Sequence, residues 1–326
     1  MIFTANSSFF DFEYVRMGNF WYVFFIVLCL GLTALTLFIC RKAGKKFSKV
    51  LIQVLLWSNF ALHFLKQFIP YYFQRWPVIL VDSLFPNLCA ILIVTAPFIY
   101  LWGNAYFKDY FFYIGTVSGL GVLFYPSGPM DIAQYPGGFF SNPDYLICVA
   151  RFYLCHFLLL VTALIMVLEG FHKINYRRLW AIPFIYALYL GGVSLNSIML
   201  GPVFHHPWYP QDWVGPDGVF NPRGEHSVIA NQSMNFGPQP FLDNILSPIY
   251  PYLPQGLMTY KVGDQYYFVP VLWQLPFIAL ATLLAGPLMA LPFDYQHMRD
   301  DRYKRQQLRR WKKMARRARK EAKKGN

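Results

Sequence analysis

Seven predominantly apolar segments, each long enough to cross a bilayer, constrain the fold of this chain more than any other feature. A membrane-spanning helix needs about 20 mostly apolar residues, because the hydrocarbon core is roughly 30 Å thick. The segments cover residues 19–40, 50–72, 78–102, 105–125, 145–170, 179–200 and 269–293. Charged residues make up only 14% of the chain, against about 25% in an average soluble domain. The sequence therefore predicts an all-α membrane protein, a bundle of about seven transmembrane helices.

The distribution of Lys and Arg predicts the orientation of this bundle. The turns after the first and fifth segments hold eight of them: Arg41, Lys42, Lys45, Lys46, Lys49, Lys173, Arg177 and Arg178. Residues 295–326 add 14 Lys or Arg and only three Asp or Glu, to a chain whose net charge is +13. Seven crossings place these regions on one side, which the positive-inside rule assigns to the cytoplasm. We expect the N-terminus outside, the C-terminus in the cytoplasm, and a location in the cell membrane.

The same reasoning divides the chain into three parts. Residues 1–18 form an outer N-terminal segment, residues 19–293 the transmembrane domain, and residues 294–326 a basic cytoplasmic tail. The first apolar segment begins too late and lacks the basic start of a cleavable signal peptide, so we expect a retained helix. The outer loops 126–144 and 201–268 are rich in Pro and are either binding elements or a rigid cap.

Polar residues inside the apolar segments point to a cavity. Ionisable groups at membrane depth are costly and usually face the interior of a bundle. At 1.5 Å of rise per residue, Cys89 and His156 both lie roughly 16 Å below the outer surface. The inner half holds far fewer polar groups than the outer half. The further polar groups at the midplane or in the outer half are His63, Lys66, Asp82, Thr116, Arg151 and Asn196. The sequence predicts a polar cavity that opens outward or into the outer leaflet.

Cys89 and His156 are the candidate catalytic residues. A thiol beside a His can form the thiolate nucleophile that acyl transfer requires. The other four cysteines also lie in or at the ends of apolar segments, and none lies in an outer loop, so no disulfide framework is indicated. This pattern is compatible with a bacterial cytoplasmic membrane. Asn87, beside Cys89, is a candidate donor to an oxyanion, and Arg151, Asn196 and Thr116 are candidates to bind the oxyanion or the substrate.

The remaining polar clusters indicate no cofactor. His205, His206 and nearby acidic residues in loop 201–268 could bind a metal, but the two His are adjacent rather than at helical spacing, which favours a solvated loop. We therefore predict neither metal nor cofactor. The tail from Arg299 to Lys324 lacks a continuous apolar stripe, and its charge predicts contact with anionic lipid headgroups. Binding of the ribosome or another RNA is the alternative, since the same charge attracts any phosphate polymer.

Three motifs resemble those of the YwaF-like integral membrane family. Residues 84–91, with Cys89 at their centre, resemble its Leu-Pro-Leu-His-Leu-Cys motif, and Asn87 stands at the place of that His. Residues 113–126 resemble its Gly-rich helix that ends at a Pro, residues 151–156 resemble its stretch ending in a His, and Asn196 resembles its late Asn. Eukaryotic relatives include an ether-phospholipid acyltransferase with a catalytic Cys, and more distant ones hydrolyse fatty-acid esters. The resemblance implies that Cys89 is the nucleophile and His156 the general base.

The leading hypothesis is therefore a membrane-embedded lipid acyltransferase or acyl-ester hydrolase. The alternative is a transporter or channel for a small polar or lipid solute, in which Lys66, Asp82 and Arg151 line the pathway and Cys89 only packs. A third possibility is an assembly factor that recruits ribosomes through its basic tail.

Overall fold

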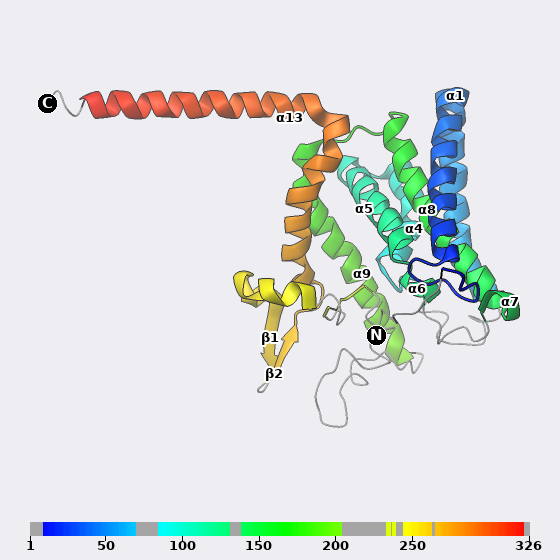
Figure 1. The fold of residues 1–326 in the computed structure, drawn as a ribbon. Helices are drawn as coiled ribbons and strands as arrows, with labels where there is room; N and C mark the ends of the chain where they lie inside the picture. Colours follow the sequence, from blue (N-terminus) through cyan, green and yellow to red (C-terminus); the bar gives the residue numbers. More distant parts are fainter. Residues whose placement is uncertain are drawn as a thin grey trace.

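The computed structural model describes residues 9–69, 84–130, 138–203, 233–235, 237–238, 244–262 and 265–322. Its long helices are α1 (Phe20–Leu65), α4 (Leu88–Trp102), α5 (Ala105–Phe124), α8 (Pro143–Leu168), α9 (Ile182–Val203) and α13 (Leu275–Ala322). Short helices connect them: η1 (Lys66–Phe68), α6 (Ser127–Met130), α7 (Gly138–Ser141), η3 (Tyr176–Ala181), η5 (Ser247–Tyr252), α12 (Gln255–Met258) and η6 (Leu272–Gln274). The predicted helical bundle is confirmed (Figure 1).

Helix α1 is a hairpin of two helices that meet at Gly44. At 46 residues, a straight helix would extend about 69 Å, more than twice the thickness of the hydrocarbon core. Gly44 has φ +83° and ψ 172°, a backbone conformation that side chains with a Cβ rarely adopt. The hydroxyl of Ser48 donates to the carbonyl of Cys40 across the turn at 3.2 Å. The two halves run side by side in Figure 1, so α1 contains the first predicted segment and residues 50–65 of the second.

Helix α8 lies at the centre of the bundle. It packs against both α1 and α5, and most of its side chains are buried, including Tyr145, Leu159 and Ile165, each fully inaccessible. By contrast, α1 and α13 expose large apolar side chains such as Leu35 (52%) and Leu283 (71%). Lipid is the medium in which such surfaces are stable. The burial pattern thus distinguishes a protein-facing helix from lipid-facing ones.

Among the described residues, four helical stretches are long and apolar enough to cross a membrane. They are Phe20–Phe68, Pro143–Leu168, Tyr176–Asn196 and Leu272–Ala315, and Leu88–Trp102 is a shorter apolar helix. Helix α4 begins at Leu88, although the sequence predicts a segment from residue 78. Residues 70–83 lie outside the described part, and the Asn87 side chain caps the helix by accepting from the Ala90 N–H at 2.9 Å. The protein is therefore a membrane protein with several apolar helices.

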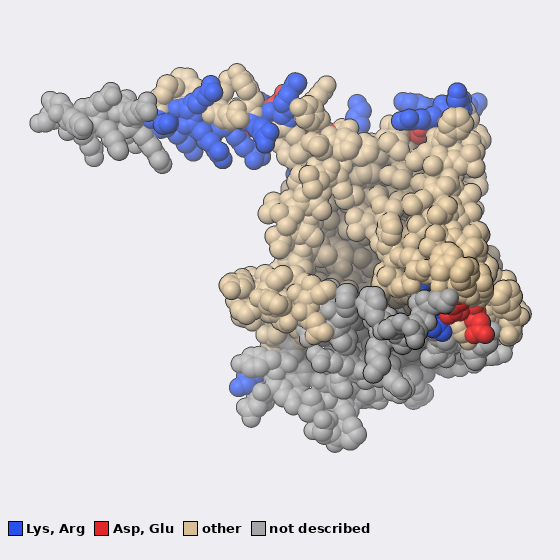
Figure 2. Space-filling view, in the orientation of Figure 1, with Lys and Arg blue, Asp and Glu red and all other residues tan. Residues whose placement is uncertain are grey.

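The two ends of the bundle differ in charge. The turn of α1, the loop after α8 and the tail lie at one end, where Lys and Arg gather in Figure 2. The opposite end carries a small antiparallel hairpin of β1 (Thr259–Val262) and β2 (Gln265–Phe268), in the register Thr259↔Phe268. The described part of loop 201–268 therefore contains regular structure.

A buried ion-pair group ties together the basic end. Asp109 on α5 is 1% exposed and contacts Arg178 and His172. Arg178 donates through Nε to Oδ2 at 2.5 Å and through an Nη to Oδ1 at 3.0 Å, and His172 Nε2 lies 2.6 Å from Oδ1. Sequence analysis did not single out Asp109. These two partners, His172 and Arg178, explain how the buried carboxylate is tolerated there.

Candidate functional site

Cys89 occupies the first turn of α4. The first N–H groups of a helix lack partners within the helix and create a positive electrostatic end that stabilises an anion. Two neighbouring N–H groups are already used, because the Leu88 N–H donates to Ser233 Oγ at 2.8 Å and the Ala90 N–H donates to Asn87. Among the described residues, the N–H of Cys89 has no acceptor. The geometry therefore places a free donor beside a thiol that the helix end can help to ionise.

Asn87 has a structural role that limits its chemistry. Its Oδ1 is engaged as the N-cap of α4. An amide oxygen only accepts, so the Nδ2 amide group is the part of this side chain that can donate to an oxyanion. If an oxyanion forms at Cys89, the backbone N–H of Cys89 is the donor that its position on α4 fixes most rigidly.

The imidazole of His156 is oriented by its own helix. Its Nδ1 lies 2.7 Å from the carbonyl oxygen of Phe152, one turn earlier in α8. A carbonyl oxygen only accepts, so Nδ1 carries the proton and Nε2 presents a lone pair. His156 is 8% exposed, so water hardly competes for this hydrogen bond. The arrangement gives His156 the tautomer that a general base requires.

One turn of α5 separates Cys89 from His156. The Ser118 hydroxyl is near enough to the Cys89 thiol to interact with it, although it is buried without a hydrogen bond of normal geometry. The next residue, Gly119, lies against the carbonyl oxygen of His156 and against Leu160, since a Cβ there would come within 3.1 Å and 2.9 Å of them. Within the described residues, no hydrogen bond joins Cys89 directly to His156. The structure therefore brings the predicted pair to two sides of the same short stretch of α5.

The Gly119 contact predicts a strong packing constraint at this site. We expect Gly119→Ala to destabilise the protein by about 1–3 kcal/mol, because the added methyl group meets the backbone of α8 as well as the Leu160 side chain. Gly121→Ala is the matched control on the same helix, since a Cβ at Gly121 meets nothing within 4 Å. Thermal unfolding in detergent measures the difference. Equal melting temperatures for the two variants would contradict close α5–α8 packing at this level.

A second group of polar residues lies where α1 meets α8. His63 Nε2 is 2.9 Å from the carbonyl of Leu84, and the Asn59 amide donates to the carbonyl of Cys155 at 3.0 Å. Lys66 and Arg151 both act electrostatically on Cys155, and Arg151 also acts on His156. The side chains of His63 and Lys66 are buried. Three of the residues predicted to line a cavity, His63, Lys66 and Arg151, thus gather at this helix boundary.

The remaining predicted residues are placed differently. Asn196 is 7% exposed and lies one turn beyond Gly192, whose backbone packs against Ile91 of α4. Thr116 is buried, but it is two residues from Ser118 and so turned about 200° around α5 from the side that contacts Cys89. Asp82 lies outside the described residues, as do His205 and His206. In the described part, no three His, Cys, Asp or Glu side chains gather closely enough to hold a metal.

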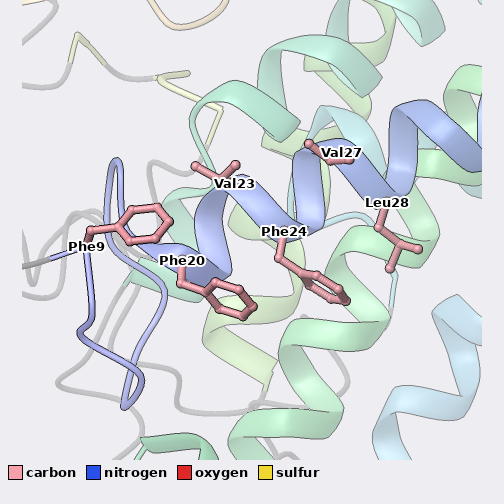
Figure 3. A pocket seen from close by; sticks show the side chains of 6 residues that line it. All are labelled: Phe9, Phe20, Val23, Phe24, Val27 and Leu28. Atoms are coloured by element: carbon pink, nitrogen blue, oxygen red, sulfur yellow. The ribbon is translucent and has the colours of Figure 1, made fainter.

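A recess on the surface of α1 is apolar rather than polar. Its volume is about 360 Å³ (Figure 3), and it is lined by Phe9, Phe20, Val23, Phe24, Val27 and Leu28. Neither Cys89 nor His156 belongs to this lining. It faces the surroundings of the bundle and matches a lipid chain in polarity, so it differs from the polar cavity that the sequence predicts.

Sequence reasoning missed two functional features of the site. Ser118 was not singled out, although it lies on the same apolar segment as the candidate Thr116. The residue type at position 152 does not indicate the hydrogen bond to His156, because every residue has a backbone carbonyl. Only the helical spacing of four residues between Phe152 and His156 indicates that contact.

Taken together, apolar helices with lipid-facing surfaces, a partly buried Cys on α4 and a buried His on α8, with α5 between them, define a polytopic helical membrane protein with a candidate thiol site. The chain belongs to the TMEM164 family, whose model matches residues 11–201 and so covers both Cys89 and His156. No curated protein and no solved structure shows detectable similarity to it.

Proposed function

We propose that this protein is a membrane-embedded lipid acyltransferase or acyl-ester hydrolase with Cys89 as nucleophile and His156 as general base. The observation that carries the proposal is their placement: a thiol at the positive end of α4 and an imidazole with an available Nε2, on two sides of Ser118–Gly119. The resemblance of residues 84–91 and 151–156 to the YwaF-like family supports the same assignment. Acyl esters of membrane lipids are the proposed substrates.

The chemistry begins with removal of the Cys89 proton. His156 Nε2 accepts it, with Ser118 close enough to the thiol to relay it. The thiolate attacks the carbonyl carbon of the acyl ester, and the oxyanion that forms accepts a hydrogen bond from the Cys89 N–H. Collapse of this intermediate breaks the ester C–O bond, and the imidazolium of His156 returns the proton to the departing lysolipid oxygen. A thioester on Cys89 remains.

The second half of the reaction consumes the thioester. A hydroxyl of a lysolipid, or water, loses its proton to His156 and attacks the thioester carbonyl. The new ester or acid leaves, and the thiolate of Cys89 takes the proton back. The acceptor alone distinguishes transferase from hydrolase. We infer seven crossings, with the basic end in the cytoplasm, which would put the Cys89 end of α4 in the outer half; the gathering of Lys and Arg at one end supports this orientation.

Acyl capture tests the proposal. The protein is purified in detergent, incubated with phospholipid carrying a labelled acyl chain, and analysed by intact mass and peptide mapping, with and without hydroxylamine. We expect one hydroxylamine-sensitive acyl group, on the peptide that contains Cys89. Four other cysteines are internal controls. Acylation spread over several cysteines, or no acyl group together with no lipid turnover, would contradict the proposal.

A further inference from the structure

Helix α13 changes direction sharply at Asp294. This residue has φ −133° and ψ 25°, outside the helical region, and separates an apolar first part from a basic second part. The Asp294 side chain is buried, and its Oδ2 accepts from the Tyr176 N–H at 2.9 Å. In Figure 1 the first part runs along the bundle, whereas the second part extends sideways away from it. The turn is therefore anchored to η3 rather than free.

A second contact fixes the direction of the basic part. Asp301 lies about two turns after the break and forms a two-pronged ion pair with Arg177, with Nε to Oδ2 at 2.9 Å and an Nη to Oδ1 at 2.5 Å. The Tyr176 hydroxyl also donates to Asp301. Paired guanidinium–carboxylate bonds define an orientation as well as a distance. We call the contacts of Asp294 and Asp301 with Tyr176 and Arg177 the tail latch. It holds the second part of α13 along the end of the bundle.

Helical geometry separates charge from apolar side chains in this part of α13. At 100° per residue, five basic residues fall within a sector of about 100°: Arg302, Arg305, Arg309, Lys312 and Lys313. Four exposed apolar residues fall on the other side, within about 140°: Tyr303, Leu308, Trp311 and Met314. Asp300 and Lys304 also fall within this second sector, and Arg299 and Arg310 fall between the two sectors. The exposed apolar side chains therefore share one side of the helix, although Asp300 and Lys304 interrupt that side.

The position of the helix favours a membrane surface as its partner. A bilayer that surrounds the bundle must have its headgroups at the level of the bundle's end, and the helix extends sideways at that level beyond the other elements. The Lys and Arg side chains visible in Figure 2 lie mainly along its front and its lower edge, the edge that faces the same way as the bundle. The turn of α1 adds further basic residues at the same level. Binding of a nucleic acid would not require the basic side chains to face this plane.

We propose that residues 295–322 bind the anionic headgroups of the adjacent membrane leaflet through the side that carries Arg302, Arg305 and Arg309, with the tail latch holding the helix flat. Attraction between basic residues and anionic lipid acts within a short distance of the surface and is weakened by salt. The binding is independent of acyl chemistry, so it can be tested apart from the proposed function. Its partner is a lipid surface, not a substrate in the site near Cys89.

Two adjacent positions provide a directional test. Gln306 lies beside the basic sector and Gln307 about 100° away in the apolar one, and both are exposed. Each is replaced by Cys and labelled with a fluorophore in the full-length protein, and the unsubstituted protein gives the background, since four native cysteines are buried. The labelled proteins are reconstituted into nanodiscs of neutral or 30% anionic phospholipid. Quenching by lipids with a spin-labelled headgroup is then measured.

We expect the probe at Gln306 to be quenched about threefold more than the probe at Gln307 in anionic discs, with the difference lost in neutral discs and at 0.5 M salt. The quadruple variant R302Q/R305Q/R309Q/K312Q should lose it in anionic discs while eluting normally in size exclusion. Equal quenching at both positions, or quenching that ignores lipid charge and salt, would overturn the proposal. So would weak quenching in every disc combined with tight binding of a single-stranded RNA probe.

Discussion

Replacement of Cys89 by alanine is expected to reduce lipid acyl turnover by at least about 1,000-fold, because the proposed reaction passes through an acyl intermediate on the Cys89 thiol. The thiol is the only nucleophile at the first turn of α4, and its neighbour Ser118 interacts with it without a second partner in the described residues. Turnover is measured by mass spectrometry of lipids in proteoliposomes. The variant should fold normally, since Cys89 is only partly buried.

Cys148→Ala is the matched control for this prediction. Cys148 is a buried cysteine on α8 that no step of the proposed reaction uses, so its replacement should leave turnover within about twofold. Full activity of the Cys89 variant would remove the covalent mechanism. If that variant instead retained flux of a polar solute that depends on Arg151, the transporter alternative would replace the enzyme.

His156→Ala is expected to lower turnover by about 100- to 10,000-fold, the usual contribution of a positioned general base. The variant should be partly rescued at high pH, because hydroxide then forms the thiolate that His156 would otherwise generate. Activity should rise with pH in the variant more steeply than in the unchanged protein. A rate against pH profile from pH 6 to 10 measures this slope.

His297→Ala provides the comparison for the His156 variant. The His297 side chain is 65% exposed at the basic end of the molecule, so its loss should not alter the pH profile. A His156 variant that keeps both its rate and its profile would show that another group activates Cys89. Such a result would leave the Cys89 prediction standing, so the two tests are independent.

Local sequence signals located several helices closely. Helix α5 was predicted at residues 105–125 and is observed at Ala105–Phe124, where Asn104 caps it through its side-chain oxygen. Helix α8 was predicted at 145–170 and is observed at Pro143–Leu168, beginning after the capping residue Asn142. Apolar length and capping residues are local properties, so they can be read without knowledge of the fold. Helix α4 begins later than its predicted segment. Pro86 and the N-cap Asn87 are local signals for a helix start, and they define the first residue of α4 more strongly than the apolar composition does.

The candidate site was only partly accessible from the sequence. The depth of a residue follows from its distance along a helix, so Cys89 and His156 could be assigned the same level. Depth does not tell which helices are neighbours. Ser118 and Gly119 could therefore not be identified from the sequence as the residues between Cys89 and His156. Asp109 was missed for the same reason, because its partners His172 and Arg178 are more than 60 residues away along the chain.

The sequence by itself determined that this chain is a helical membrane protein with a basic tail. The length of an apolar segment and the clustering of charge depend only on residues that are close together in the sequence. The tertiary structure decided that α5 separates the thiol from the imidazole, that Asp109 pairs with Arg178 and His172, and that the tail turns at Asp294 into a helix with two chemically different sides. These features arise from contacts between residues distant in sequence, which depend on how helices pack and not on the composition of any one of them.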